Sequence, residues 1–230
     1  MRIQGVASVF LSGGTGYLGR HLIPILLARG HNVASLARPG SAARLPAGCR
    51  AVTGDALRAS TFGAALAGYD TFIHLTGTPK PAPWKERKFR AVDLPSLMAS
   101  VDAAAAPGSA VRHFIYVSVA QPAPVMQAYV AVRREAEAYL QRAGLAQRTV
   151  IRPWYVLGPG HWWPYALKPF YALAARSARY RDAAERLGLV TIEEMTAALA
   201  EAVEEPPSGA AAERIVETAQ IRAAISADTR

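Results

Sequence analysis

The stretch Ser12-Gly13-Gly14-Thr15-Gly16-Tyr17-Leu18-Gly19 decides the fold of this chain. An apolar run at Val6–Leu11 precedes it and predicts a strand, and apolar residues follow it at helical spacing at Leu22, Ile25 and Leu26. A strand, a glycine-rich turn and a helix in this order are typical of a phosphate-binding turn. The alternative is a glycine-rich loop that holds no ligand.

The glycines of this turn have different expected tasks. Gly13 permits the sharp turn after the strand, Gly16 permits close approach of a pyrophosphate, and Gly19 lets the helix lie close to the sheet. The amides at the start of the helix and its positive dipole end attract the phosphates. The predicted cofactor contacts in this region are therefore Gly13, Thr15, Gly16, Tyr17, Leu18 and Gly19.

Length and composition indicate one globular α/β domain. The chain has 230 residues, of which 51% are hydrophobic, which is sufficient for a large core. The sequence shows no signal peptide and no apolar run long enough for a transmembrane helix. Cys49 is the single cysteine, which excludes an internal disulfide and a cysteine-cluster zinc site. A cytoplasmic location is the expectation.

The charge balance is strongly basic, with a formal net charge of +9 at pH 7. Nucleic-acid binding would require these charges to cluster on one element. The arginines are instead spread along the whole chain, with modest groups at Lys85–Arg90 and Arg176–Arg181. We therefore expect an arginine-rich surface that attracts an anionic cofactor, and no nucleic-acid partner.

Strand and helix patterns alternate along the chain, which predicts an α/β fold with a doubly wound parallel sheet. The predicted strands are Val6–Leu11, Asn32–Ala37, Arg50–Thr53, Thr71–Thr76, Val111–Val119, Arg148–Arg152 and Arg214–Glu217. The predicted helices after the first are Thr61–Ala67, Phe89–Ala105, Met126–Ala143 and Thr191–Glu205, with Pro95 near the start of the second or kinking it. The last ten residues are expected to fray.

The end of the second predicted strand carries Arg38, followed by Ser41 and Arg44. An acidic residue about 20 positions after the glycine turn would bind the ribose hydroxyls of NAD, and this chain has none there. Because a guanidinium binds a phosphate through charge-assisted hydrogen bonds, Arg38 favours NADP(H) over NAD(H). Asp55 follows the third strand, where it could accept a hydrogen bond from adenine or cap a helix.

A second group of polar residues consists of Ser118 at the end of the fifth predicted strand and Tyr129 and Arg133 on the next helix. With these residues the chain resembles the short-chain dehydrogenase/reductase superfamily, in its extended or atypical, epimerase-like branch. The resemblance covers about residues 6–160. It rests on Ser12–Gly19, Gly54-Asp55, His74-Leu75-Thr76-Gly77, Ser118, Tyr129–Arg133, Arg152-Pro153 and Tyr155–Gly160.

The resemblance implies a Rossmann domain and a role for each matched residue. Tyr129 would be the acid/base, and Ser118 would bind the same substrate oxygen. The family has a lysine four residues after the tyrosine, which lowers the tyrosine pKa and holds the nicotinamide ribose; this chain has Arg133 there. The resemblance also places Gly77 against the cofactor.

The substitution of arginine for lysine has a physical consequence. The i, i+4 spacing puts Tyr129 and Arg133 on one face of the helix. A tyrosine that works at neutral pH needs its pKa lowered by roughly three units, and a cation at about 4 Å could supply this. The flat, longer fork of Arg133 could displace the ribose. The alternative is that Tyr129 is an ordinary buried tyrosine.

Two histidines carry no predicted role. His74 is expected to be a core histidine, and His161 has no neighbours at metal-ligand spacing, so no metal site is predicted.

An aromatic segment runs from Trp154 to Tyr171 and includes Tyr155, Trp162 and Trp163. Three interpretations are open: the wall of a hydrophobic substrate pocket, a surface for a partner or a membrane, and the core of a small cap. We take Trp154, Tyr155, Trp162 and Trp163 as candidate pocket residues.

These observations together predict a single NAD(P)-binding Rossmann domain over residues 1–230, in which 153–213 contribute a small C-terminal cap. The predicted function is that of an oxidoreductase or epimerase-like enzyme acting on a small, partly apolar substrate, with homodimerisation open. One alternative is a catalytically inactive dinucleotide-binding sensor or structural subunit. A third is an isoflavone-reductase-like or quinone-reducing enzyme, which would use a lysine elsewhere, with Lys80, Lys85 and Lys88 as candidates.

Overall fold

A sheet of seven parallel strands forms the centre of the protein in the computed structural model, which describes residues 5–159, 186–209 and 211–228. The strand order is β3-β2-β1-β4-β5-β6-β9, and every neighbouring pair is parallel. This confirms the predicted doubly wound α/β fold. The strands are β1 (Ser8–Ser12), β2 (Asn32–Ala37), β3 (Arg50–Thr53), β4 (Thr71–His74), β5 (His113–Val117), β6 (Gln147–Arg152) and β9 (Ala212–Glu217).

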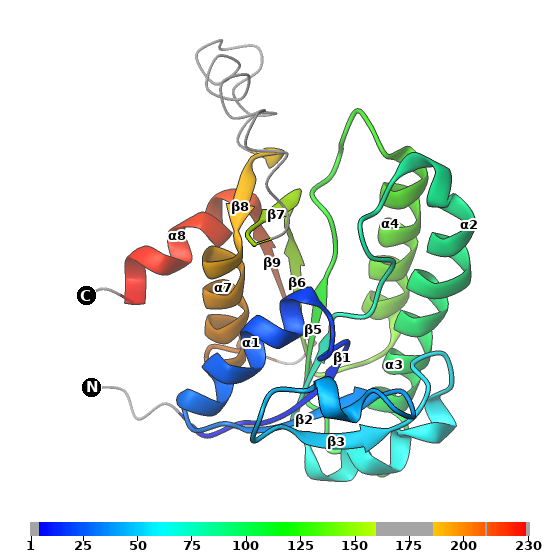
Figure 1. The fold of residues 1–230 in the computed structure, drawn as a ribbon, viewed down its shortest axis with the longest axis vertical. Coiled ribbons are helices and arrows are strands. Elements are labelled where there is room, and N and C mark those ends of the chain that lie inside the picture. The colour runs from blue at the N-terminus through cyan, green and yellow to red at the C-terminus, as the bar shows by residue number, and fades with distance from the viewer. Residues whose placement is uncertain (1–4, 160–185, 210, 229–230) are drawn as a thin grey trace.

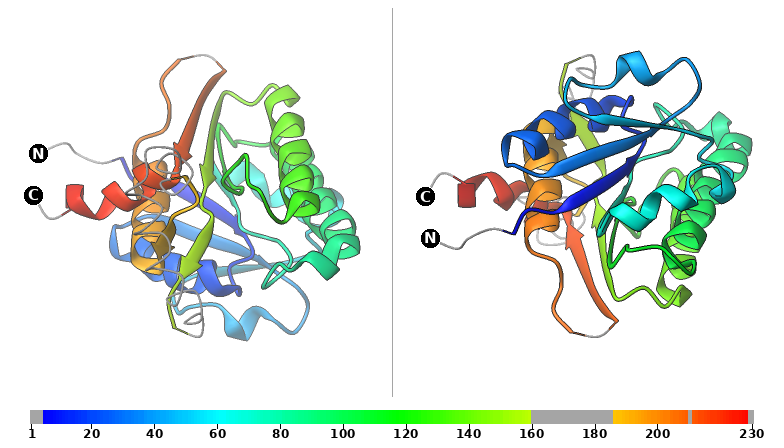
Figure 2. Two further views of the ribbon diagram at one scale, coloured as in Figure 1. Left: turned by 90° about the horizontal axis from the view of Figure 1, so that it is seen from above. Right: turned by 90° about the horizontal axis from the view of Figure 1, so that it is seen from below.

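Helices cover both faces of the sheet (Figure 1). One layer consists of α1 (Tyr17–Ala28), α7 (Ile192–Glu204) and α8 (Thr218–Asp228), and the other of α3 (Leu94–Ala105) and α4 (Gln127–Arg142). Figure 2 shows the sheet between these layers from above and below. Among the described residues, no helix combines the length and the apolar character needed to cross a bilayer.

Alternating residues of the buried strands supply the two cores. In β1, Val9 and Leu11 pack with Leu22 of α1, while Phe10 faces the opposite way and packs with Phe72. All of these side chains are fully buried. Because helices cover both faces, the central strands β1, β4 and β5 are buried along almost their whole length.

The strand order creates a switch point between β1 and β4. The chain leaves β1 toward β2 and β3 on one side, and then returns to β4 on the other side of β1. Ligands of doubly wound sheets bind outside the carboxyl ends of strands at such a point. The glycine turn at 12–19 lies directly after β1 and therefore at this edge.

Two predicted helices differ from the structure. Residues predicted as a helix at Thr61–Ala67 form short 3₁₀ turns, since glycines at both ends of the second turn disfavour a longer α-helix. The predicted helix at Phe89–Ala105 opens with a π-helical turn, which runs into α3 with Pro95 in its first turn. Proline has no N–H for an interior helical bond, which favours a departure from regular α-helix at this point. The additional short elements are η1 (Ala42–Arg44), η2 (Ala59–Thr61), η3 (Gly63–Gly68), η4 (Pro83–Lys85), α2 (Glu86–Lys88) and η5 (Phe89–Asp93).

The C-terminal part contains elements that the sequence did not predict. Strand β7 (Tyr155–Leu157) pairs in parallel with β8 (Leu189–Thr191) in a separate two-stranded sheet. Helix α8 forms where a frayed end was expected. Helix α7 begins at a capping box in which Thr191 and Glu194 exchange side-chain bonds with each other's backbone N–H.

Candidate functional site

The glycine turn lies close against the chain that leaves β4. Gly13 has φ +85°, and a Cβ atom there would lie 2.8 Å from the carbonyl carbon of Leu75 and 2.9 Å from the nitrogen of Thr76. The N–H of Gly16 donates to the carbonyl of Gly13 at 2.9 Å, which closes the turn. Only glycine fits at position 13 without strain.

The start of α1 leaves its backbone amides available for an anion. Gly16 is the N-cap and is exposed, and no side chain caps the helix or adds a negative charge in its first turn. A helix start of this kind combines unsatisfied N–H groups with the positive end of the helix dipole. The geometry of the predicted contacts at 13–19 is therefore that of a phosphate-binding turn.

Three polar residues after β2 lie at the same edge of the sheet. Arg38 and Arg44 are exposed, and Ser41 lies between them at the start of η1. The end of β2 carries no acidic residue. Asp55 uses its carboxylate locally, accepting from the N–H of Leu57 at 3.0 Å.

The segment Leu75–Gly77 connects the glycine turn with the residues on α4. On one side this segment contacts Gly13 through the backbone of Leu75 and Thr76. On the other side, a Cβ atom at Gly77 would lie 2.7 Å from Nη2 of Arg133 and 3.2 Å from Oδ1 of Asp93. Because glycine stands there, the guanidinium approaches the backbone closely. The two predicted parts of the site therefore meet along one short stretch of chain.

Tyr129 and Arg133 lie on one face of α4, as their spacing predicted. The guanidinium carbon of Arg133 lies 4.9 Å from the centre of the Tyr129 ring, and Phe89 packs on that ring at 4.9 Å. Tyr129 also packs with a small apolar cluster that includes Val119 and Ala120. Burial raises the pKa of Tyr129 above its ordinary value of 10.0, Arg133 opposes the shift, and Asp93 adds to it.

Arg133 is itself buried and is held by several hydrogen bonds. Nη2 donates to Oδ1 of Asp93 at 2.8 Å, and Nη1 donates to the Tyr116 hydroxyl and the Val117 carbonyl, each at 3.1 Å. The other carboxylate oxygen of Asp93 accepts from the N–H and the hydroxyl of Thr78 at 3.0 and 2.6 Å. Arg133 and Asp93 therefore form a buried ion pair with fixed geometry.

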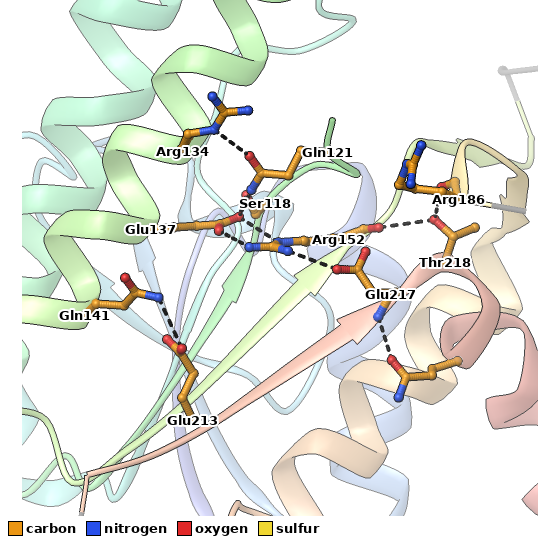
Figure 3. Close-up of polar contacts among 11 residues, drawn as sticks. Ser118, Gln121, Arg134, Glu137, Gln141, Arg152, Arg186, Glu213, Glu217 and Thr218 are labelled. Carbon is orange, nitrogen blue, oxygen red and sulfur yellow. Dashed lines mark hydrogen bonds and ion pairs between the residues drawn. The ribbon is translucent and has the colours of Figure 1, made fainter. Parts of the chain in front are cut away.

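Ser118 belongs to a different polar network, drawn in Figure 3. Its hydroxyl donates to Oε1 of Glu137, which also accepts from Gln121 at 2.9 Å. Arg152 donates from Nε and Nη2 to the two carboxylate oxygens of Glu137, at 3.1 and 2.5 Å. Its Nη1 donates to Oε1 of Glu217 on β9 at 2.9 Å. To donate a hydrogen bond to a substrate oxygen, the Ser118 hydroxyl would have to give up its hydrogen bond to Glu137. The role of Ser118 as a substrate-binding residue stays a prediction.

His74 lies in the core beneath the turn. Its Nδ1 lies 3.0 Å from the Ser12 hydroxyl and 3.1 Å from the Ser100 hydroxyl. Burial and the nearby Arg133 lower its pKa from 6.5 to about 3, so the ring is neutral at physiological pH. The structure thus places His74 where the sequence expected a core histidine.

The candidate pocket residues are divided by what the structure describes. Trp154 packs in the apolar cluster with Tyr129, and Tyr155 begins β7. Trp162 and Trp163 lie outside the described residues. The described parts of the chain contain no group of three His, Cys, Asp or Glu residues that could hold a metal ion.

Sequence reasoning missed the partners of the α4 residues. Asp93 lies 40 positions before Arg133, and Glu137 is buried four positions after it. Their one sequence signal is an acidic residue on a helix face that is mostly apolar, because such a residue is seldom buried without a cationic partner. Arg152 was noted only as part of the resemblance.

Comparison with known proteins agrees with a dinucleotide site at the glycine turn. A model of the NAD(P)H-binding family matches residues 13–160. A ceramide reductase from Caulobacter vibrioides (strain NA1000 / CB15N) is 30% identical over 171 residues, which cover 74% of this chain and 51% of that protein. The chain therefore spans about half the length of the curated relative that it matches.

Solved structures share the fold at low sequence identity. The Bordetella bronchiseptica enzyme WbmH, in complex with NAD⁺, is 19% identical with a TM-score of 0.62, over 92% of this chain and 75% of that one. UDP-N-acetylglucosamine 4-epimerase from Bacillus cereus is 14% identical with a TM-score of 0.64, over 92% and 75%. With the matched family model and the glycine turn, they lead to one conclusion. The chain belongs to the NAD(P)H-binding family and has the Rossmann fold that these solved structures share.

Proposed function

We propose that this protein is an NADP(H)-dependent oxidoreductase whose substrate is small and partly apolar, with Tyr129 as its acid/base. The contact of Leu75–Gly77 with Gly13 on one side and Arg133 on the other is the observation that carries this proposal. A dinucleotide whose diphosphate lies on the turn would follow this segment toward Tyr129. Such an arrangement brings a nicotinamide and an acid/base group together.

Arg38 is the proposed determinant of coenzyme choice. Its guanidinium and that of Arg44 are exposed at the edge where the adenosine half of the cofactor would lie, and Ser41 adds a hydroxyl. This set fits a 2′-phosphate by charge and hydrogen bonding. NAD(H) is the alternative coenzyme, because these residues do not block a plain ribose.

The surroundings of Tyr129 support an apolar group on the substrate. Val119, Ala120, Ala123 and Trp154 share its cluster, so the surroundings of the Tyr129 side chain are largely apolar apart from the Arg133–Asp93 pair. The Caulobacter relative is a reductase of ceramide, which is consistent with a carbonyl or hydroxyl next to an aliphatic chain. We therefore infer a substrate with one reacting oxygen and an apolar remainder.

Turnover of NADPH against a panel of ketones, aldehydes and quinones tests this proposal. The Tyr129→Phe variant should lose about 100-fold or more of any detected rate, with NADPH affinity unchanged. Tyr139→Phe is the matched control, because Tyr139 lies on the same helix but bonds Asp102 at 2.5 Å on the exposed side. Full turnover in Tyr129→Phe would remove Tyr129 from the chemistry.

One observation, the ion pair between Arg133 and Asp93, favours a second function as a dinucleotide-binding protein without catalysis. The family lysine position is occupied here by a cation held in a buried ion pair. Such a site can bind the dinucleotide without reacting, as in a sensor or a structural subunit. Tight NADPH binding with no oxidation across the whole panel would favour this alternative.

A further inference from the structure

A buried ion pair lies directly beside the proposed acid/base. Arg133 and Asp93 expose only 7% and 1% of their side chains, and the pair is closed by a 2.8 Å contact. Asp93 ends the π-helical turn η5, and its second oxygen accepts two bonds from Thr78. An oxygen pair that only accepts hydrogen bonds is the form of an ionised carboxylate. The negative charge is therefore fixed next to the guanidinium.

The position of Asp93 changes what Arg133 does to Tyr129. A lone cation 4–5 Å from a phenol stabilises the phenolate, by about two pH units or more at an effective dielectric near 20. Here the cation touches an anion, so Asp93 offsets part of the effect of Arg133 on the ring. The guanidinium also lies over the Tyr129 ring at 4.9 Å from its centre, with its N–H groups bonded to Asp93, Tyr116 and Val117.

The titratable groups that face Tyr129 in the described part of the chain come from three elements. They are Arg133 on α4, Asp93 on η5 and Tyr116 on β5. Phe89 and the residues Val119 and Ala120 cover the ring with carbon. Glu137, two turns further along α4, has its own cation in Arg152. The balance at Tyr129 is therefore set by the Asp93–Arg133 pair and by burial.

We propose that the Asp93–Arg133 pair keeps Tyr129 as the neutral hydroxyl, so that the site donates a proton and works as a carbonyl reductase. Asp93 is then a positioning residue that acts through Arg133. This inference rests on the proposed function and deepens it by giving the direction of the reaction. The opposite reaction, oxidation of an alcohol, needs the phenolate as base and is disfavoured near neutral pH.

The proposed step balances with NADPH as the reductant. Bound NADPH would supply a hydride to the carbonyl carbon and leave as NADP⁺. The C=O π electrons move to oxygen, which takes the proton of the Tyr129 hydroxyl. The phenolate then regains a proton from water. The raised pKa of Tyr129 agrees with this role, because the hydroxyl holds its proton until the oxygen becomes basic.

Tyrosinate absorbance measured on the protein without cofactor tests the inference. Titration curves of the wild type minus Tyr129→Phe isolate the signal of Tyr129. We expect no ionisation of Tyr129 below about pH 10 in the wild type and a midpoint about one to two pH units lower in Asp93→Asn. Arg133→Gln should move the midpoint the other way, and this variant decides the question if Asp93→Asn does not fold.

Unchanged midpoints in the folded variants would overturn the inference, as would a wild-type midpoint near neutral pH. A pH profile gives the second readout: Asp93→Asn should oxidise an alcohol substrate at lower pH than the wild type does. If NADPH does not bind, the proposed function fails while the titration still reports on the ion pair. If NADPH turns over and the midpoints do not move, only this inference fails.

Discussion

The glycine turn at 12–19 and the buried face of α4 meet at Leu75–Gly77. The turn is formed by backbone groups, whereas the face of α4 is formed by side chains. The turn presents backbone amides, and its shape follows from glycines that are close in sequence. The face of α4 presents the side chains Arg133 and Glu137, whose partners lie far away on other elements. The first region needs a particular backbone; the second needs a particular balance of charges.

Gly13→Ala should disrupt the glycine turn. A side chain at φ +85° costs about 1–2 kcal/mol, and the contact at 2.8 Å with the Leu75 backbone adds about 1–3 kcal/mol. We expect a loss of about 4 kcal/mol in the free energy of unfolding and no detectable NADPH binding. Denaturant unfolding and calorimetry measure the two effects.

Gly30→Ala is the matched control for this substitution. Gly30 has φ +86°, but a Cβ atom there would meet no other atom within 4 Å, so only the conformational strain applies. NADPH binding should be retained in Gly30→Ala. Equal losses of stability in the two variants would contradict the role of the Gly13–Leu75 contact.

Glu137→Ala should disrupt the polar network on the face of α4. Glu137 is buried and holds Arg152 at two positions as well as Ser118 and Gln121, so its removal leaves a cation partly uncompensated. We expect a loss of about 3 kcal/mol in the free energy of unfolding. Glu135→Ala, on the same helix as Glu137, removes an exposed pair with Arg90 of η5 and should cost less than about 1 kcal/mol. A loss of that small size in Glu137→Ala would contradict the network.

His74 links the two regions and predicts a dependence of stability on pH. Its folded pKa of about 3 lies below the unfolded value of 6.5, so the unfolded chain binds the extra proton as the pH falls. The stability present above 6.5 therefore decreases below it, by about 2 kcal/mol at about pH 5 for this residue. Urea unfolding at about pH 7.5 and pH 5 measures the difference, which should be about 2 kcal/mol smaller in His74→Gln. A difference that His74→Gln leaves unchanged would show that His74 is not the source.

The sequence predicted the backbone-built region well and the side-chain region only in part. The parallel α/β sheet, the turn at 12–19 and the meeting of Tyr129 and Arg133 on one helix face follow from local patterns. Asp93 could not be found in this way, because a contact across 40 residues leaves no periodic signal. The π-helical turn η5 was also not predicted, since the neighbouring Pro95 is its single sequence signal.

The smallest expected effect concerns coenzyme choice. Arg38→Ala should weaken NADPH binding about tenfold, equivalent to about 1.4 kcal/mol, and leave NADH binding unchanged, because only the 2′-phosphate is read by this residue. Arg112→Ala is the control: Arg112 is also exposed but lies at the opposite, amino end of β5. Equal weakening of NADPH and NADH would assign Arg38 a general electrostatic role.

Calorimetric titration of the full chain with NADPH and NADH tests the central claim most directly. We expect saturable binding of NADPH that is tighter than the binding of NADH and is lost in Gly13→Ala. The absence of heat with both dinucleotides at millimolar concentration, for a protein shown to be folded, would contradict it.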